Sequence, residues 1–143
     1  MLALSGCGDN GSPEEEVTKS VRNWTAALSE GNGGAACGRM TTGGRTELAR
    51  FAQTFAKTTP AADCPTNVKR FTHSLSPQVA RQTLDADVDD VKIDGEVAIV
   101  RMADGGPTQI RLLKEDDGEW RVDEAFRHGW RLIGSPNYAQ GVR

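Results

Sequence analysis

The N-terminal half of the chain repeats apolar residues with the period of an α-helix. Ser12 and the residues after it combine a capping box with proline at the first helical position and acidic residues in the first turn, so a helix is predicted over 13–30. Gly31 and Gly33 end it. Trp24 is interpreted as a core residue, with the lining of a ligand pocket as the alternative. The apolar face of this helix carries Val17, Val21, Trp24 and Leu28.

Further helical patterns fill the chain up to residue 84. A short helical turn is predicted over 35–40, and a longer helix over 45–57. Asp63-Cys64-Pro65 opens another helix, and a last turn or short helix is predicted over 76–84. The glycine pairs before the first two of these segments are interpreted as breaks between helices, because they lack the Lys-Ser/Thr of a phosphate-binding loop.

The period changes from helical to alternating after residue 87. Turns that contain Asp-Gly separate four predicted strands, over 88–93, 96–102, 108–114 and 119–125. The expected fold class is α+β, with the N-terminal helices packed on one face of a curved antiparallel four-stranded meander. The tail over 126–143 is expected to add a fifth strand, to cover one end of this structure or to present a partner-binding surface.

The length and charge of the chain limit the number of domains and the kinds of partner that we expect. With 143 residues, we expect a tether over 1–12 and a single domain over 13–125. The formal net charge is −3, and the 20 acidic residues are interspersed with 17 Lys and Arg residues, so no basic face for nucleic acid is expected. No segment approaches the roughly 18 consecutive apolar residues of a spanning helix.

The first seven residues contain a pattern typical of bacterial lipoprotein processing. Leu4-Ser5-Gly6-Cys7 places small residues before a cysteine whose thiol can take a thioether-linked diacylglycerol, and a polar segment typical of a flexible tether follows. We expect lipidation at Cys7 and an extracytoplasmic location on the outer face of the bacterial cytoplasmic membrane. An ordinary N-terminus that contains a cysteine is the alternative.

The two remaining cysteines are expected to bond to each other. Assigning Cys7 to the lipid leaves Cys37 and Cys64, and paired thiols outside the cytoplasm usually form a disulfide. Such a bond would join two helical segments. A metal site or a nucleophilic cysteine is the alternative, although neither residue belongs to a CxxC motif or has a histidine at ligand spacing.

The order of helices before a meander, with the hairpin over 91–100 and the closing Trp120-Arg121-Val122-Asp123, resembles the nuclear transport factor two-like superfamily. More narrowly, it resembles the small actinobacterial lipoproteins of that superfamily, over residues 14–125. The resemblance implies a cone whose mouth can hold a ligand or an active site. It also implies a lipobox cysteine, one cysteine after the first helix and one at the opening of a later helix, which here are Cys7, Cys37 and Cys64.

The candidate cavity of this cone has no complete catalytic set. The resemblance implies that enzymes of the superfamily use an acid with Tyr, Asn or His inside the cone. Strand alternation predicts that the two late-strand acids of this chain point to opposite faces. No motif for a dinucleotide, a phosphate loop, a nucleophilic serine or a zinc protease occurs, so no catalytic residue, cofactor or metal is assigned. The cavity is assigned to Trp24, Met102, Leu113, Trp120, Asp123, Glu124 and His128.

The function expected from the sequence is that of a lipid-anchored extracytoplasmic binding or accessory domain rather than an enzyme. Its expected partners are the membrane, through the lipid anchor, and a protein or a small apolar ligand. A dimer is also compatible with the sequence. Two alternatives stay open, namely a small-molecule enzyme that uses the cone and a receptor for an apolar ligand such as a lipid.

Overall fold

The predicted order of helices before a meander is confirmed by the computed structural model, which describes residues 12–84, 87–103, 105–127 and 130–131. Four strands form an open antiparallel sheet in the order β2-β3-β5-β6, which makes the fold α+β. The described elements are α2 (Pro13–Glu30), α3 (Gly33–Gly38), α4 (Thr42–Phe55), α5 (Cys64–His73), α6 (Pro77–Leu84), β2 (Val88–Asp94), β3 (Val97–Met102), β4 (Gly106–Pro107), β5 (Gln109–Lys114), β6 (Trp120–Glu124) and β7 (Trp130–Arg131).

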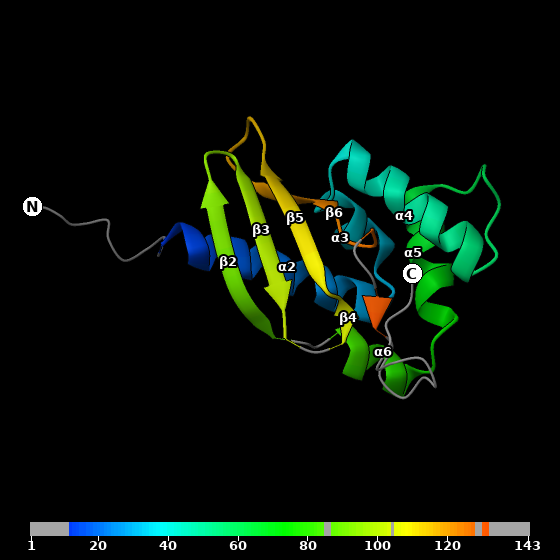
Figure 1. Ribbon diagram of the computed structural model, residues 1–143. Coiled ribbons are helices and arrows are strands. Elements are labelled where there is room, and N and C mark those ends of the chain that lie inside the picture. The colour runs from blue at the N-terminus through cyan, green and yellow to red at the C-terminus, as the bar shows by residue number, and fades with distance from the viewer. Residues whose placement is uncertain (1–11, 85–86, 104, 128–129, 132–143) are drawn as a thin grey trace, which may run out of the picture.

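The helices are arranged on one face and at one end of the sheet. Helix α2 crosses behind the strands and contacts both edge strands, β2 and β6, while the other helices gather beside β6 and below it (Figure 1). The opposite face of β2, β3 and β5 is turned toward the viewer of Figure 1, and no described helix covers it. The sheet therefore has one face packed against helices and one face that no described helix covers, hereafter the uncovered face, as the alternating pattern predicts.

The hydrophobic core lies between α2 and the inner face of the sheet. Trp24 and Leu28 are completely buried there, together with the inward residues of β3 and β5. The end of α2 is joined to α5, because the Thr72 hydroxyl donates a hydrogen bond to the Leu28 carbonyl at 2.5 Å. Trp24 is thus a core residue, as expected from its position on the apolar stripe.

The glycine pairs begin helices rather than separate them. Gly33 opens α3, and Gly44 lies in the first turn of α4, which starts at Thr42 and not at residue 45 as predicted. A Cβ atom on Gly33 would lie 2.6 Å from the Cα atom of Pro65, and one on Gly44 would overlap the carbonyl oxygen of Val122. The glycines do lie at helix boundaries, but within the first turns of α3 and α4 rather than before them, because they serve close packing, which their small size permits there.

The expected disulfide is present. Cys37 in α3 and Cys64, the first residue of α5, are bonded, with their Cα atoms 6.1 Å apart and a separation of 27 positions in the sequence. The bond joins two helices, as predicted. Cys7 lies outside the described residues.

The tail forms a strand, but not in the main sheet. Trp130–Arg131 pairs with Gly106–Pro107 to make a separate two-stranded sheet. The sequence interpretation took 104–106 as a turn and missed this pairing, because two residues next to a glycine pair give no alternating pattern. His128 and residues 132–143 lie outside the described part of the chain, and none of the helices described is long and apolar enough to cross a membrane.

Replacing Gly44 by alanine is predicted to destabilise the protein by about 1–3 kcal/mol, because the new methyl group would displace the backbone of β6 from α4. Gly34→Ala is the matched control, since a Cβ there meets nothing within 4 Å. That change should stabilise α3 by about 0.5 kcal/mol. Urea unfolding of the two variants measures both effects, and equal effects of the same sign would contradict the packing described for Gly44.

Candidate functional site

The apolar residues assigned to the cone are part of a filled core or lie outside it. Trp24, Met102 and Trp120 are 0%, 4% and 5% exposed. Leu113 lies on the other face of the sheet. Ile110 and Leu112 are buried on the inner face, and Leu113, which follows Leu112 in the strand, points the opposite way and is half-buried. The cavities formed by described residues are lined by other side chains. A ligand site among these residues therefore has to be sought at the surface.

Asp123 and Glu124 lie on the same side of the molecule, contrary to the prediction from strand alternation. A β-bulge is the cause, since Arg111 pairs with Glu124 and Leu112 pairs with Val122, which leaves Asp123 without a counterpart on β5. The Arg111 guanidinium faces both carboxylates, at 3.9 Å from each. The bulge therefore brings the two acids together at the end of β6.

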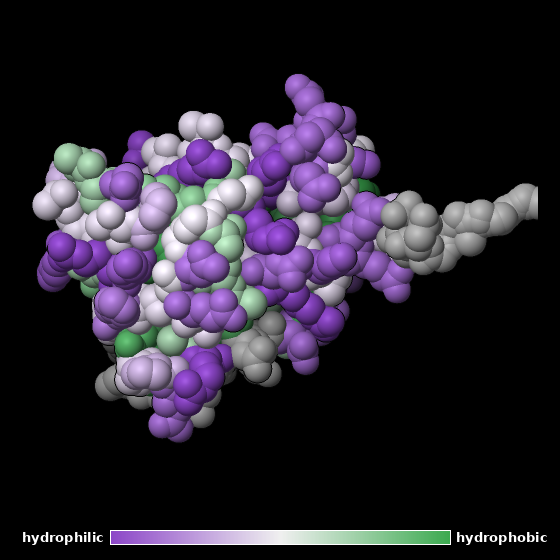
Figure 2. All heavy atoms as spheres, turned by 180° about the vertical axis from the view of Figure 1, so that it is seen from behind, coloured by the Kyte–Doolittle hydropathy of each residue, from purple (hydrophilic) through white to green (hydrophobic). Residues whose placement is uncertain are grey.

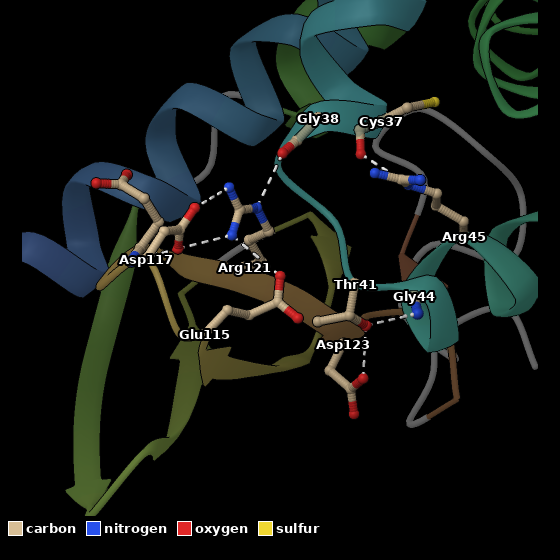
Figure 3. Close-up of polar contacts among 10 residues, drawn as sticks. Cys37, Gly38, Thr41, Gly44, Arg45, Glu115, Asp117, Arg121 and Asp123 are labelled. Atoms are coloured by element: carbon tan, nitrogen blue, oxygen red, sulfur yellow. Dashed lines mark hydrogen bonds and ion pairs between the residues drawn. The ribbon is translucent and has the colours of Figure 1, made fainter.

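The chain between α3 and α4 holds β6 in place. Val122 exchanges backbone hydrogen bonds with this segment, donating to the Arg39 carbonyl at 2.8 Å and accepting from the Thr41 amide at 2.9 Å. The Thr41 hydroxyl donates to Asp123 at 2.6 Å and accepts from the Gly44 amide at 2.9 Å, which caps α4 (Figure 3). The start of α4 and the end of β6 are thus fixed against each other.

A second set of contacts joins the β5–β6 turn to the end of α3. Arg121 donates to the Gly38 carbonyl at 3.1 Å, to Glu115 at 3.0 Å and to Asp117 at 2.7 Å (Figure 3). The hydrogen bond from Arg121 lowers the pKa of Asp117 to about 2. This network anchors the other end of β6, so the strand is held at both ends.

Glu47, which the sequence analysis did not select, is an acid of this region whose pKa is raised. It projects from α4 toward the chain after β6, where one carboxylate oxygen accepts a hydrogen bond from the Ala125 amide at 2.7 Å. Burial raises the pKa of Glu47, assisted by the negative charge of Glu124, while the amides of the Ala125 segment oppose this shift. The other carboxylate oxygen is buried and has no hydrogen-bond partner among the described residues.

A polar cleft of about 310 Å³ lies where α4 meets the end of β6. Its acids already have partners within the protein, since Asp123 and Glu124 face Arg111 and Glu47 binds a backbone amide. Arg127 is 3.2 Å from Glu124. The polar cleft is lined by Gly43, Thr46, Glu47, Arg50, Asp123, Glu124 and Arg127.

An aromatic cleft of about 340 Å³ adjoins the polar cleft. Its rings are in contact, with 4.6 Å between the ring centres of Phe51 and Phe126 and 5.3 Å between those of Phe51 and Phe55. Three charged residues, Glu47, Arg50 and Arg127, line both clefts, so the two form one composite cleft. The aromatic cleft is lined by Glu47, Arg50, Phe51, Thr54, Phe55, Phe126 and Arg127.

One sequence signal could have indicated the aromatic cleft. Glu47, Phe51 and Phe55 recur at every fourth position, so they share a face of α4 beside the core face that carries Leu48 and Ala52. Phe126 was placed in the tail and left without a position. Its proximity to α4 depends on contacts across the fold, which the sequence pattern does not contain.

A larger cavity, about 570 Å³, lies elsewhere and carries weaker chemistry. It lies between α2 and α6, and the ion pair that lines it, Arg22 with Asp87 at 3.6 Å, has both side chains mostly in solvent. The composite cleft is smaller but combines a raised pKa, a row of aromatic rings and fixed charges, which are properties of ligand sites. Within the described ranges no group of three or more His, Cys, Asp or Glu residues could hold a metal ion.

Comparisons with known proteins give no further assignment of this site. No protein-family model, curated protein or solved structure matches the chain.

Ionisation of Glu47 is predicted to lower the free energy of unfolding as the pH rises. The pKa of Glu47 is higher in the folded protein than in the unfolded chain, where it has its ordinary value of about 4.5. Above about that pH the folded protein therefore keeps more of this proton than the unfolded chain does. The wild-type protein should therefore lose stability relative to Glu47→Gln from about that pH up to the folded-state pKa, above which the difference is constant. Urea unfolding at several pH values measures this difference.

Glu96→Gln, an exposed change in the β2–β3 turn, controls for the removal of one negative charge. A wild-type protein that gains stability over Glu47→Gln as the pH rises would contradict the burial of this carboxylate.

Proposed function

We propose that this protein is a lipid-anchored extracytoplasmic domain that binds a small apolar ligand in the composite cleft. The observation that carries the binding function is the row of contacting rings, Phe51, Phe55 and Phe126, in a cavity of about 340 Å³ with charged groups at its edge. Apolar pockets with a few placed polar groups are typical of small-molecule sites, and this volume suits a small ligand. The site lies beside the sheet and not inside the cone that the sequence analysis expected.

The proposed location is supported by the cysteines. Leu4-Ser5-Gly6-Cys7 has the lipobox pattern, and a disulfide between Cys37 and Cys64 fits an oxidising compartment. The element order also supports the proposed relationship to the nuclear transport factor two-like superfamily. Two acyl chains on Cys7 would be sufficient for stable anchoring.

A broad protein interface is less well supported on the face seen in Figure 2. Hydrophilic residues dominate this view, and the hydrophobic residues among them are interrupted by polar ones (Figure 2). Large, permanent interfaces instead use contiguous apolar surface. This disfavours a large, permanent protein interface on that face.

One observation favours an enzyme as a second candidate function. Glu47 lines both clefts with a raised pKa, which is a property of catalytic acids. Against this, one of its oxygens is occupied by the Ala125 amide, and Asp123 and Glu124 are both directed at Arg111. The three acids therefore have structural contacts, so binding is the better supported function.

The anchor is predicted to depend on one thiol. Expressed in a bacterium behind a complete lipoprotein leader, the full chain should partition with membranes, and its Cys7→Ser variant should remain in the aqueous fraction. The folded domain should be unaffected, since Cys7 precedes α2 and lies outside the described residues. Membrane fractionation and immunoblotting measure the effect, and equal partitioning of the two proteins would refute the anchor.

Binding in the aromatic cleft is predicted to depend on Phe55. Isothermal titration of the full chain with decanol, a neutral apolar probe, should show binding, and Phe55→Ser should weaken it about tenfold because a half-buried ring of the cleft is removed. Leu113→Ser is the control, since Leu113 is a half-buried apolar residue on the uncovered face of the sheet. No binding of decanol, or equal weakening by both changes, would refute the proposed site.

A further inference from the structure

The charges at the edge of the aromatic cleft select among apolar ligands. Of the residues that line this cleft, Arg50 and Arg127 are positive and Glu47 is negative. The side chains of both arginines are exposed, and Arg127 donates a hydrogen bond to Glu124 at 3.2 Å, whereas Glu47 is half-buried and its carboxylate is held by the Ala125 amide. The cleft therefore presents positive charge beside an apolar surface.

Two further acids lie nearby, in the polar cleft and not in the aromatic cleft. Asp123 and Glu124 line only the polar cleft, where both face Arg111, and Glu124 also faces Arg127. Arg50 makes no hydrogen bond or ion pair within the described part of the chain. Its guanidinium is thus the cation at the junction of the two clefts that has no protein partner there.

The geometry matches a ligand with two unlike ends. The rings of Phe51, Phe55 and Phe126 offer an apolar surface in the aromatic cleft, and Arg50 and Arg127 line both this cleft and the polar cleft beside it. An arginine binds a carboxylate through two parallel hydrogen bonds, which fixes the orientation of the ligand as well as its charge.

We propose that the composite cleft binds a small amphiphilic anion, a single apolar chain that carries a carboxylate, with the chain on Phe51, Phe55 and Phe126 and the carboxylate at Arg50 and Arg127. This inference rests on the proposed function and adds the class of ligand. Glu47 is the acid among the described residues that line the aromatic cleft, and burial raises its pKa.

The experiment compares three probes of equal chain length on the full chain, by isothermal titration below the concentrations at which they form micelles. Decanoate is expected to bind about tenfold more tightly than decanol, and decyltrimethylammonium more weakly than decanol, because the charge-assisted hydrogen bonds to arginine are available only to decanoate. Arg50→Gln/Arg127→Gln should bring decanoate to the affinity of decanol and leave decanol unchanged.

The matched control is Arg70→Gln/Arg101→Gln, which removes two exposed arginines outside the cleft and should keep the full preference for decanoate. Equal binding of decanoate and decanol by the wild-type protein would overturn the anionic ligand and leave the apolar site intact. Binding of none of the three probes would overturn the proposed function as well.

A final arm distinguishes a free ligand from a lipid surface. Phosphatidylglycerol vesicles carry the same combination of apolar chain and anionic group, and the Cys7→Ser variant should not sediment with them. Sedimentation that decanoate abolishes would show that the cleft faces a membrane and would overturn the proposal of a free, single-chain ligand.

Discussion

The pairing of Val122 with the segment between α3 and α4 is the contact on which the rest of this region depends. Two backbone hydrogen bonds, at 2.8 and 2.9 Å, join β6 to Arg39 and Thr41. An edge strand carries unpaired amides and carbonyls, and here part of that edge is satisfied by the helical layer of the same chain. Gly44 permits the approach, because no side chain separates the start of α4 from the Val122 carbonyl.

The composite cleft is a consequence of this pairing. Once α4 begins against β6, Glu47 in its second turn reaches the Ala125 amide, and the rings further along α4 reach Phe126. The disulfide at Cys37 and the hydrogen bond from Arg121 to Gly38 hold α3 from its other side. The start of α4 and the end of β6, which carry the cleft, are therefore held against each other by hydrogen bonds, which limits the entropy lost when a ligand binds.

Local patterns predicted the elements well, and contacts across the fold account for what they missed. The cap at Ser12, the alternation in β3 and β5 and the pairing of Cys37 with Cys64 are all local or compositional signals, and the structure confirms them. The start of α4 was misplaced because two glycines normally disfavour a helix, and only the nearby strand explains them.

The candidate site shows the same limit. Strand alternation placed Asp123 and Glu124 on opposite faces, and a bulge that the sequence does not mark brought them together. Trp24 and Trp120 fill the core instead of lining a cone, while Glu47, one polar residue among many on a helix, became part of the cleft through its contact with Ala125. A residue's type and spacing give its local structure, but its partners depend on the tertiary fold.

The central claim is that the ligand site is the composite cleft and not the interior between helices and sheet. Mapping decanoate binding by nuclear magnetic resonance on the assigned protein tests it most directly. The account predicts that the ring signals of Phe51, Phe55 and Phe126 and the side-chain signal of Arg50 shift with increasing decanoate, while the indole signal of Trp120 does not. Shifts centred on Trp120 and Met102, with the phenylalanine rings unaffected, would contradict it.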